Sequence, residues 1–296
     1  MSLSYTIYDA LLGATTLRQC TAGEFTANAR PIVARTSGGV SPAEIYGGET
    51  APMGSFESED LGTLLAISNF LQSGIVVSSS TLAMVLQQRA QGGTYQSGSN
   101  HFAATAANGL VVPTRIQIPE KGNCSIGLDA HFRGTSSLTN PVSFNVAAAL
   151  ASTLFNGCYA FAGIDFNNGT LITRGTGVTV NPGIQVLAEG FNGGNYPTSL
   201  SIQERNPTID VSFDNAANLA NFASAFTAMT SLVVYLRKRS GAGWVADEEE
   251  EHIAISFADG MTTFETIRAS GRDSSVGTLR FHGEALSASA VSAIPA

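Results

Sequence analysis

The residues most suggestive of chemistry form a run of acidic side chains directly before a histidine, in the segment WVADEEEEHIAISFADGM at 244–261. Carboxylates and imidazole can hold a divalent cation or exchange protons with a substrate. A cation site needs ligands that converge on one point, whereas consecutive residues of an extended or mobile loop point in diverging directions. We therefore expect a solvated loop or a subunit contact. The run consists of Asp247, Glu248, Glu249, Glu250 and Glu251, followed by His252.

Short motifs mark many enzyme classes, and this chain contains none of the common ones. It lacks the GxSxG, HExxH, phosphate-loop and GxGxxG patterns. Its histidines, His101, His131, His252 and His282, occupy matching positions in two parts of the chain, which favours structural hydrogen bonds over catalysis. We predict no catalytic residue, no metal ligand and no cofactor, and hence a protein that is not an enzyme.

The charge and composition of the chain reduce the number of functional classes that it could belong to. A formal net charge of −8 does not suit a protein that grips nucleic-acid phosphates, but it suits one that lets DNA pass without adhering. The cysteines, Cys20, Cys124 and Cys158, are odd in number and lack CxxC spacing, so we expect buried thiols. With 44% hydrophobic and only 13% charged residues, the chain is expected to hide surface in contacts between subunits.

The elements that must position these residues recur along the chain. TYQSGSNHFAATAANGL, at 94–110, aligns with the acidic segment and places His101 on His252. Upstream, LAMVLQQRAQGG faces LVVYLRKRSGAG, and GGVSPAEIYGGETAPMGSF faces GGNYPTSLSIQERNPTIDVSF, which pairs Ser55-Phe56 with Ser212-Phe213. We predict a tandem duplication of one domain, with units at 1–150 and 151–296.

Within each unit, the pattern predicts a mainly β fold with one helix, in the manner of a β-sandwich. Alternating runs that flank Gly-rich turns indicate long hairpins. Apolar residues at three-to-four spacing predict a helix over 58–72 and its copy over 214–229. The expected helix core residues are Leu61, Leu64 and Leu65 in the first copy and Leu219, Phe222 and Phe226 in the second.

This organisation resembles the tail tube proteins of long-tailed bacteriophages. The resemblance covers both units and lies in the strand-to-helix junctions PMGSF…DLGTLL and PTIDVSF…NLANFA, in hairpins with Gly-rich tips at 90–93 and 240–243, and in the NGLVVPT and DGMTTFE segments. It implies stacked rings of self-associating subunits that form a conduit for DNA. Some members fuse two tube domains, so that three chains make a ring that looks like the usual ring of six.

The resemblance also implies binding partners and a location for the protein. The chain would self-associate as a homotrimer per ring, contact other tail proteins, and lie in the virion tail after assembly in the host cytoplasm, without inserting into a membrane. DNA would pass through the lumen without specific binding. Candidates for the subunit interface or the lumen are Arg89, Tyr95, Arg237, Lys238, Arg239, Trp244 and the acidic residues 247–251. At a ring contact, the acidic run would pair with Arg237, Lys238 and Arg239 of the ring above; in the lumen, it would repel phosphates.

Two alternatives stay open at this point. A distal tail, baseplate or capsid-decorating phage protein would form a single ring or a trimer and never a filament. A carbohydrate-binding pair of β-sandwiches would use aromatic platforms, for which Tyr46, Tyr95, Tyr196 and Trp244 are available.

Overall fold

The structure is a computed structural model, and it describes residues 4–35, 37, 41–78, 82–89, 101–147, 155, 157–166, 171–173, 177–213, 226–268 and 276–295. Strands take up 65% of the residues and helices only 4%, so the predicted mainly β class is confirmed. Among the described residues, no helix is both long and apolar enough to cross a membrane.

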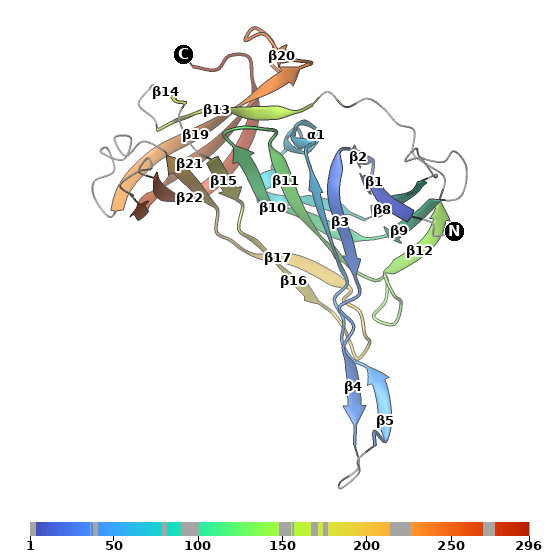
Figure 1. The fold of residues 1–296 in the computed structure, drawn as a ribbon. Coiled ribbons are helices and arrows are strands. Elements are labelled where there is room, and N and C mark those ends of the chain that lie inside the picture. The colour runs from blue at the N-terminus through green and yellow to red at the C-terminus, as the bar shows by residue number, and fades with distance from the viewer. Residues whose placement is uncertain are drawn as a thin grey trace.

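The chain alternates strands and turns from end to end (Figure 1). The first half contains β1 (Ser4–Leu12), β2 (Thr15–Leu17), β3 (Cys20–Thr26), β4 (Pro31–Ala34), β5 (Glu44–Gly47), β6 (Met53–Ser58), α1 (Leu61–Leu65), α2 (Phe70–Ser73), β7 (Ile75–Val77), β8 (Leu82–Arg89), β9 (His101–Ala106), β10 (Gly109–Pro119), β11 (Ser125–Phe132) and β12 (Val142–Ala147). The second half contains β13 (Tyr159–Asp165), β14 (Leu171–Ile172), β15 (Gly177–Asn181), β16 (Ile184–Glu189), β17 (Ser199–Arg205), β18 (Thr208–Phe213), β19 (Phe226–Ser240), β20 (Gly243–Trp244), β21 (His252–Arg268) and β22 (Val276–Val291).

Two large sheets and two separate hairpins make up the fold. A five-stranded sheet has the order β12-β9-β8-β1-β2, and a 13-stranded sheet follows β14-β13-β19-β21-β22-β18-β15-β10-β11-β6-β3, with β20 paired to β19 and β7 to β10. The hairpins β4-β5 and β16-β17 lie outside both sheets. The larger sheet therefore runs without interruption from the second half into the first, through the pairing of β15 with β10.

Strand order and register correspond between the halves. The pairings among β1, β3, β6 and β8 to β12 recur among β13, β15, β18, β19, β21 and β22, with β9 and β10 matched by the single strand β21. The register of β10 with β11 shifts between Pro113 and Arg115, and that of β21 with β22 shifts between Phe264 and Thr266. A bulge inserts one residue at one defined place, so this match fixes which residues of β10 and β21 are equivalent. The predicted boundary at 150/151 lies outside the described residues.

One part of the predicted alignment needs correction. Asp129 of β11 lies opposite Ser55, and its counterpart Arg280 in β22 lies opposite Asp210. Ser55 therefore corresponds to Asp210, two positions before the predicted Ser212. The sequence could not distinguish these alignments, because strand side chains alternate with a period of two and a shift of two residues keeps the same face buried.

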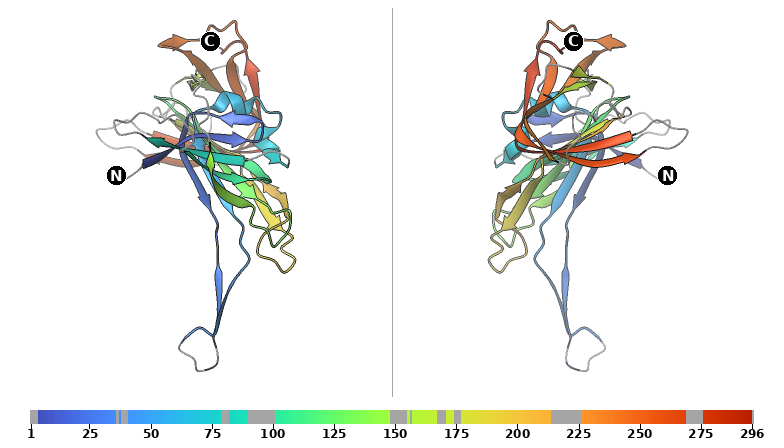
Figure 2. Two further views of the ribbon diagram at one scale, coloured as in Figure 1. Left: turned by 90° about the vertical axis from the view of Figure 1, so that its right-hand side faces the viewer. Right: turned by 90° about the vertical axis from the view of Figure 1, so that its left-hand side faces the viewer.

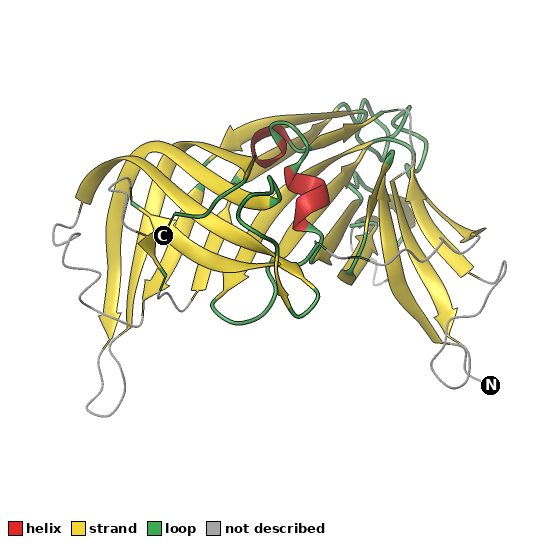
Figure 3. Ribbon diagram, turned by 90° about the horizontal axis from the view of Figure 1, so that it is seen from above, coloured by secondary structure: helices red, strands yellow, loops and turns green. Residues whose placement is uncertain are grey.

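The predicted helix over 58–72 is divided into two short helices. The Asp60 carboxylate accepts a hydrogen bond from the Thr63 amide at 3.3 Å and caps α1. Asn69 then adopts a left-handed φ of 57°, which interrupts the helix before α2 begins at Phe70. Figure 3, a view from above, places both helices near the middle of the molecule, between the strands of its two ends.

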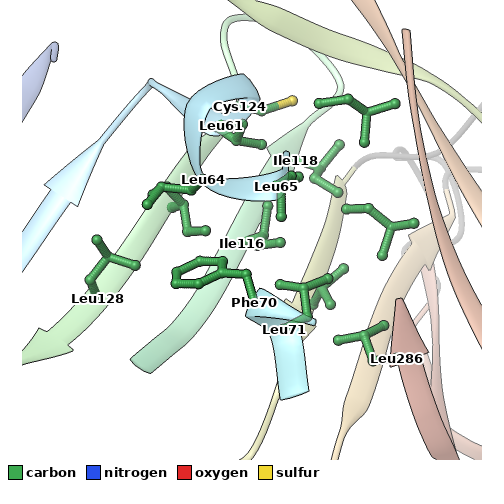
Figure 4. Close-up of a cluster of buried hydrophobic side chains, with 14 of the residues drawn as sticks. Leu61, Leu64, Leu65, Phe70, Leu71, Ile116, Ile118, Cys124, Leu128 and Leu286 are labelled. Atoms are coloured by element: carbon green, nitrogen blue, oxygen red, sulfur yellow. The ribbon is translucent and has the colours of Figure 1, made fainter. Parts of the chain in front are cut away.

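The core lies under these helices and joins the two halves. Leu61, Leu64 and Leu65 are buried, as are Phe70 and Leu71 of α2. Figure 4 shows these side chains gathered around residues from both halves, namely Ile116, Ile118, Cys124, Leu128 and Leu286. Burial of such a side chain contributes roughly 1.5–3 kcal/mol to the stability of the fold. The helices therefore stabilise the contact between the two halves as well as the first half itself.

The second predicted helix, over 214–229, is wrong at its end. Residues 214–225, which include Leu219 and Phe222, lie outside the described residues. Phe226 begins strand β19, and Phe226–Met229 pair with Gly260–Thr263 of β21. Ladder hydrogen bonds to a long neighbouring strand outweigh a helical spacing of apolar residues, because helical propensity is weak and readily overridden by tertiary contacts.

Candidate assembly surfaces

The two halves of the chain join through the pairing of β10 with β15, and this junction shows how one unit can bind another. Strands β10 and β15 pair antiparallel, with Ile116 opposite Val180 and Ile118 opposite Val178. All four side chains are buried, with at most 2% of their surface exposed. Gln117 and Thr179 alternate with them on the other face of the pair. Backbone hydrogen bonds and interlocked apolar side chains thus join the units, as in strand addition to a sheet edge.

The loop that joins β16 to β17 reinforces this junction. The Asn195 amide donates to the Ser137 carbonyl oxygen at 2.8 Å, and the Asn195 carbonyl oxygen accepts from the Thr50 amide at 2.7 Å. Arg133 donates through Nη1 to the Thr198 carbonyl oxygen at 3.2 Å. The backbone of the β16-β17 hairpin, which we call the second arm, is therefore anchored on the first half of the same chain.

The equivalents of both sides of this junction are exposed in the described part of the chain. Strand β3, the counterpart of β15, is the last strand of the sheet in the described part of the chain, and Gly23 and Glu24 are exposed. In the second half, Ile267 lies near the end of β21, beyond the residues that pair with β19, and it is the counterpart of Ile116. Ile267 is 54% exposed, whereas Ile116 is 0% exposed. The same residue type at the same register position is thus covered in one half and open in the other.

A second exposed apolar surface lies on the β4-β5 hairpin, which we call the first arm. Figure 2 shows it extending far below the body of the molecule. Its strands pair Ile32 with Tyr46 and Val33 with Ile45. All four side chains are between 45% and 65% exposed. The sequence interpretation missed this surface; alternation within PIVA and EIYG was the pattern that could have indicated it.

The acidic run folds onto the basic residues of its own hairpin. Arg237 donates through Nη2 to Asp247 Oδ1 at 2.7 Å, and the Lys238 ammonium group pairs with Glu251. Arg239 lies over the Trp244 ring, with its guanidinium carbon 5.0 Å from the ring centroid. The structure therefore brings together the predicted interface residues of this hairpin, but within one chain.

The middle of the acidic run stays in solvent. Glu248, Glu249 and Glu250 are exposed, and no cation of the described residues lies within ion-pair distance of their carboxylates. The described residues also contain no group of three or more His, Cys, Asp or Glu that could hold a metal. These three glutamates form the negative surface that the loop presents to its surroundings.

His252 and His101 perform the same structural task. Nδ1 of His252 accepts a hydrogen bond from the Lys238 amide at 3.3 Å, and Nδ1 of His101 accepts from the Gln88 amide at 3.2 Å. Both rings are 0% exposed. An acceptor at Nδ1 places the proton of the neutral ring on Nε2. For His252 this nitrogen lies 3.3 Å from Asp247 Oδ1, so the acidic run begins beside the ring.

The remaining predicted residues are scattered. Arg89 ends β8 opposite Ser4, and Tyr95 lies outside the described residues. Tyr46 is an exposed side chain on the first arm. The Tyr196 amide donates a hydrogen bond to the Ser137 carbonyl oxygen at 3.0 Å. The described aromatic residues proposed as a sugar platform therefore lie on different elements, with Tyr46 on β5, Tyr196 in the loop between β16 and β17, and Trp244 on β20.

Cys124 is a buried thiol, as predicted, whereas Cys20 and Cys158 are only partly buried. Burial raises the pKa of Cys124 to about 12, and burial, together with the nearby Asp9 carboxylate, raises the pKa of Cys20 to about 12. Burial and the Glu59 carboxylate also raise the pKa of Cys158. None of the three is therefore a thiolate at neutral pH, and a nucleophilic role has no support.

Comparison of the sequence with known protein families and with curated proteins found no match.

Proposed function

We propose that this protein is a structural subunit of a phage tail tube, which assembles into stacked rings that conduct DNA. The single observation that carries the proposal is the junction of β10 with β15, whose two equivalents, the edge of β3 and the end of β21, have no partner strand among the described residues. Ile116 is buried there by strand pairing, while Ile267 at the equivalent position is 54% exposed. The edge of β3 and the end of β21 correspond to the two sides of this junction and lie on different parts of one chain, which supports head-to-tail association.

Head-to-tail association gives either a closed ring or an open filament. Each chain contains two units of corresponding strand order, so three chains supply the six units expected of a tube ring. Closure also covers the edge of β3 and the end of β21, which would otherwise expose unpaired backbone groups to other chains. We therefore propose a homotrimer for each ring.

The charge of the chain supports a conduit. The formal net charge is −8, and Glu248, Glu249 and Glu250 face solvent. Acidic surface repels phosphates, so DNA would move past it without adhering. In this proposal the protein lies in the virion tail, is assembled in the host cytoplasm and contacts other tail proteins at the ends of the tube.

Negative-stain electron microscopy of the purified chain at several concentrations, with mass photometry on the same samples, tests the proposal. We expect hollow tubes, or rings whose mass corresponds to three chains of 30.7 kDa. Rings that never stack would favour a distal tail or decorating protein instead. Monomers at every concentration would contradict self-assembly, and binding in a glycan screen would then favour the carbohydrate-binding alternative.

A further inference from the structure

We infer that neighbouring chains join through a defined pairing of β3 in one chain with the end of β21 in the next, with Phe25 opposite Ile267 and Glu24 opposite Arg268. This inference rests on the proposed function, because it takes self-association as given. The partner is a second copy of this chain.

The register follows from two equivalences within the structure. The matched bulges make Ile267 and Arg268 of β21 the counterparts of Ile116 and Gln117 of β10. On the other side, Ser55 of β6 lies opposite Glu24, and its counterpart Asp210 of β18 lies opposite Thr179.

Glu24 is therefore the counterpart of Thr179, and Phe25 that of Val180. Within the chain, Ile116 pairs with Val180 and Gln117 with Thr179. Transferring these pairs to the open edges places Ile267 opposite Phe25 and Arg268 opposite Glu24 in the neighbouring chain.

The arrangement of strands leaves room for this addition. Strand β7 pairs with Gly109–Val111 of β10, and β15 pairs further along the same strand, at Ile116–Pro119. In the second half, the beginning of β19 takes the place of β7 and pairs with β21 at Gly260–Thr263. Beyond that point, the described strands leave the β19 side of β21 without a partner, at the position that β15 fills on β10.

The two edges also complement each other in apolar character and charge. Ile267 is an exposed apolar side chain, and Phe25 is only half-buried beside Phe56 and Phe132. The adjacent pair would be Arg268 with Glu24, whereas the junction within the chain has the neutral pair Gln117 and Thr179. Opposite charges facing each other across two strands stabilise pairing, and like charges destabilise it. This charge pair would distinguish the contact between chains from the contact within a chain.

Disulfide trapping tests the register directly. The double variant E24C/R268C places two cysteines opposite each other in the inferred pairing, at a separation that a disulfide can bridge. Under mild oxidation we expect covalent species that extend to three chains on a non-reducing gel. The matched control E24C/I267C shifts one cysteine by one residue and so turns it to the other face of the strand. We expect at least tenfold less cross-linked product from it. Wild type and the single variants control for Cys20, Cys124 and Cys158.

Charge reversal gives a second, independent readout. E24K and R268E each place like charges opposite each other, so we expect the concentration needed for assembly to rise on the order of fivefold, the fold-change that corresponds to about 1 kcal/mol per contact. The combined variant E24K/R268E restores opposite charges and should recover assembly near the wild-type concentration. Recovery in the double variant is a result that damage to the fold by either substitution would not produce.

The outcomes separate this inference from the proposed function. If wild type assembles but E24C/R268C cross-links no better than E24C/I267C, the inferred register is overturned and the assembly proposal stands. The same holds if E24K/R268E assembles no better than the single variants. If wild type stays monomeric at all concentrations, the proposed function is overturned, and the inference fails with it.

Discussion

At the scale of single residues, Asp9 lies in surroundings unfavourable to its charge. It follows the bulge in β1 and is 8% exposed. Burial raises its pKa to about 6, an effect that Arg18 opposes and Asp60 reinforces. The pKa in the folded protein therefore exceeds that in the unfolded chain. The contribution of this group to stability is complete below about pH 4 and is lost as the pH rises through 6.

Asp9→Asn removes this titration. We expect the free energy of unfolding of the unassembled chain to rise by about 1–2 kcal/mol at pH 8, and the gain to vanish at pH 4. Denaturant unfolding at both pH values measures the difference. Glu120→Gln, which removes an exposed carboxylate, is the control and should change neither value. An equal effect of Asp9→Asn at pH 4 and pH 8 would contradict an origin in the burial of charge.

At the scale of elements, the two hairpin arms have the same strand register but different surroundings. Pro31 pairs with Gly47 in the first arm, and Val186 pairs with Ile202 in the second. The loop that contains Ser137 binds the end of the second arm, whereas the first arm meets its own chain at its base, where Gly47 lies beside Asn195. The loop is absent from the second half, where β22 continues as strand through the equivalent region. In the proposed assembly, the exposed apolar side chains of the first arm are therefore available for contact with another chain.

We expect the first arm to join one ring to the next. Ile45, which is 65% exposed, can be replaced by Asp without disturbing the core, so Ile45→Asp should keep the wild-type melting temperature and form rings. It should shorten tubes severalfold in electron micrographs, because a charge would replace an apolar contact. Leu200, its half-buried counterpart in the second arm, provides the matched control: Leu200→Asp should lower the melting temperature. Full-length tubes from Ile45→Asp would disprove the stacking role.

At the scale of the whole molecule, the acidic loop bears on how DNA would pass. A contact between rings would need Arg237 and Lys238 as partners for the acidic run, but these residues pair with Asp247 and Glu251 of their own hairpin. The surroundings of Arg239 are also set within the chain, by the Trp244 ring. We therefore expect the exposed glutamates to act in the lumen rather than between rings.

Replacing Glu248, Glu249 and Glu250 by Gln tests this role. We expect normal tube length and unchanged salt sensitivity of assembly, together with increased retention of DNA fragments by the tubes at low salt. Glu120, Glu189 and Glu284, three exposed glutamates elsewhere, give a control variant with the same change in net charge. Shortened tubes whose length no longer depends on salt would instead place these glutamates at a ring contact.

Local patterns in the sequence determined the β class, the apolar face of Leu61, Leu64 and Leu65, and the matching of His101 with His252. These features depend on residues close together along the chain, where periodicity and spacing are direct consequences of helix and strand geometry. The sequence alignment also matched Ile116 with Ile267, since no gap intervenes between the histidines and these positions.

The tertiary structure alone decided which of these equivalent residues is covered. Ile116 is buried because β15 lies beside it, and Ile267 is exposed because the sheet has no further strand there among the described residues. The order of strands in a sheet depends on pairings between residues far apart in the chain, which local periodicity does not contain. For the same reason, the division of the first helix, the extension of β19 to Phe226 and the isolation of the first arm appeared only in the folded chain.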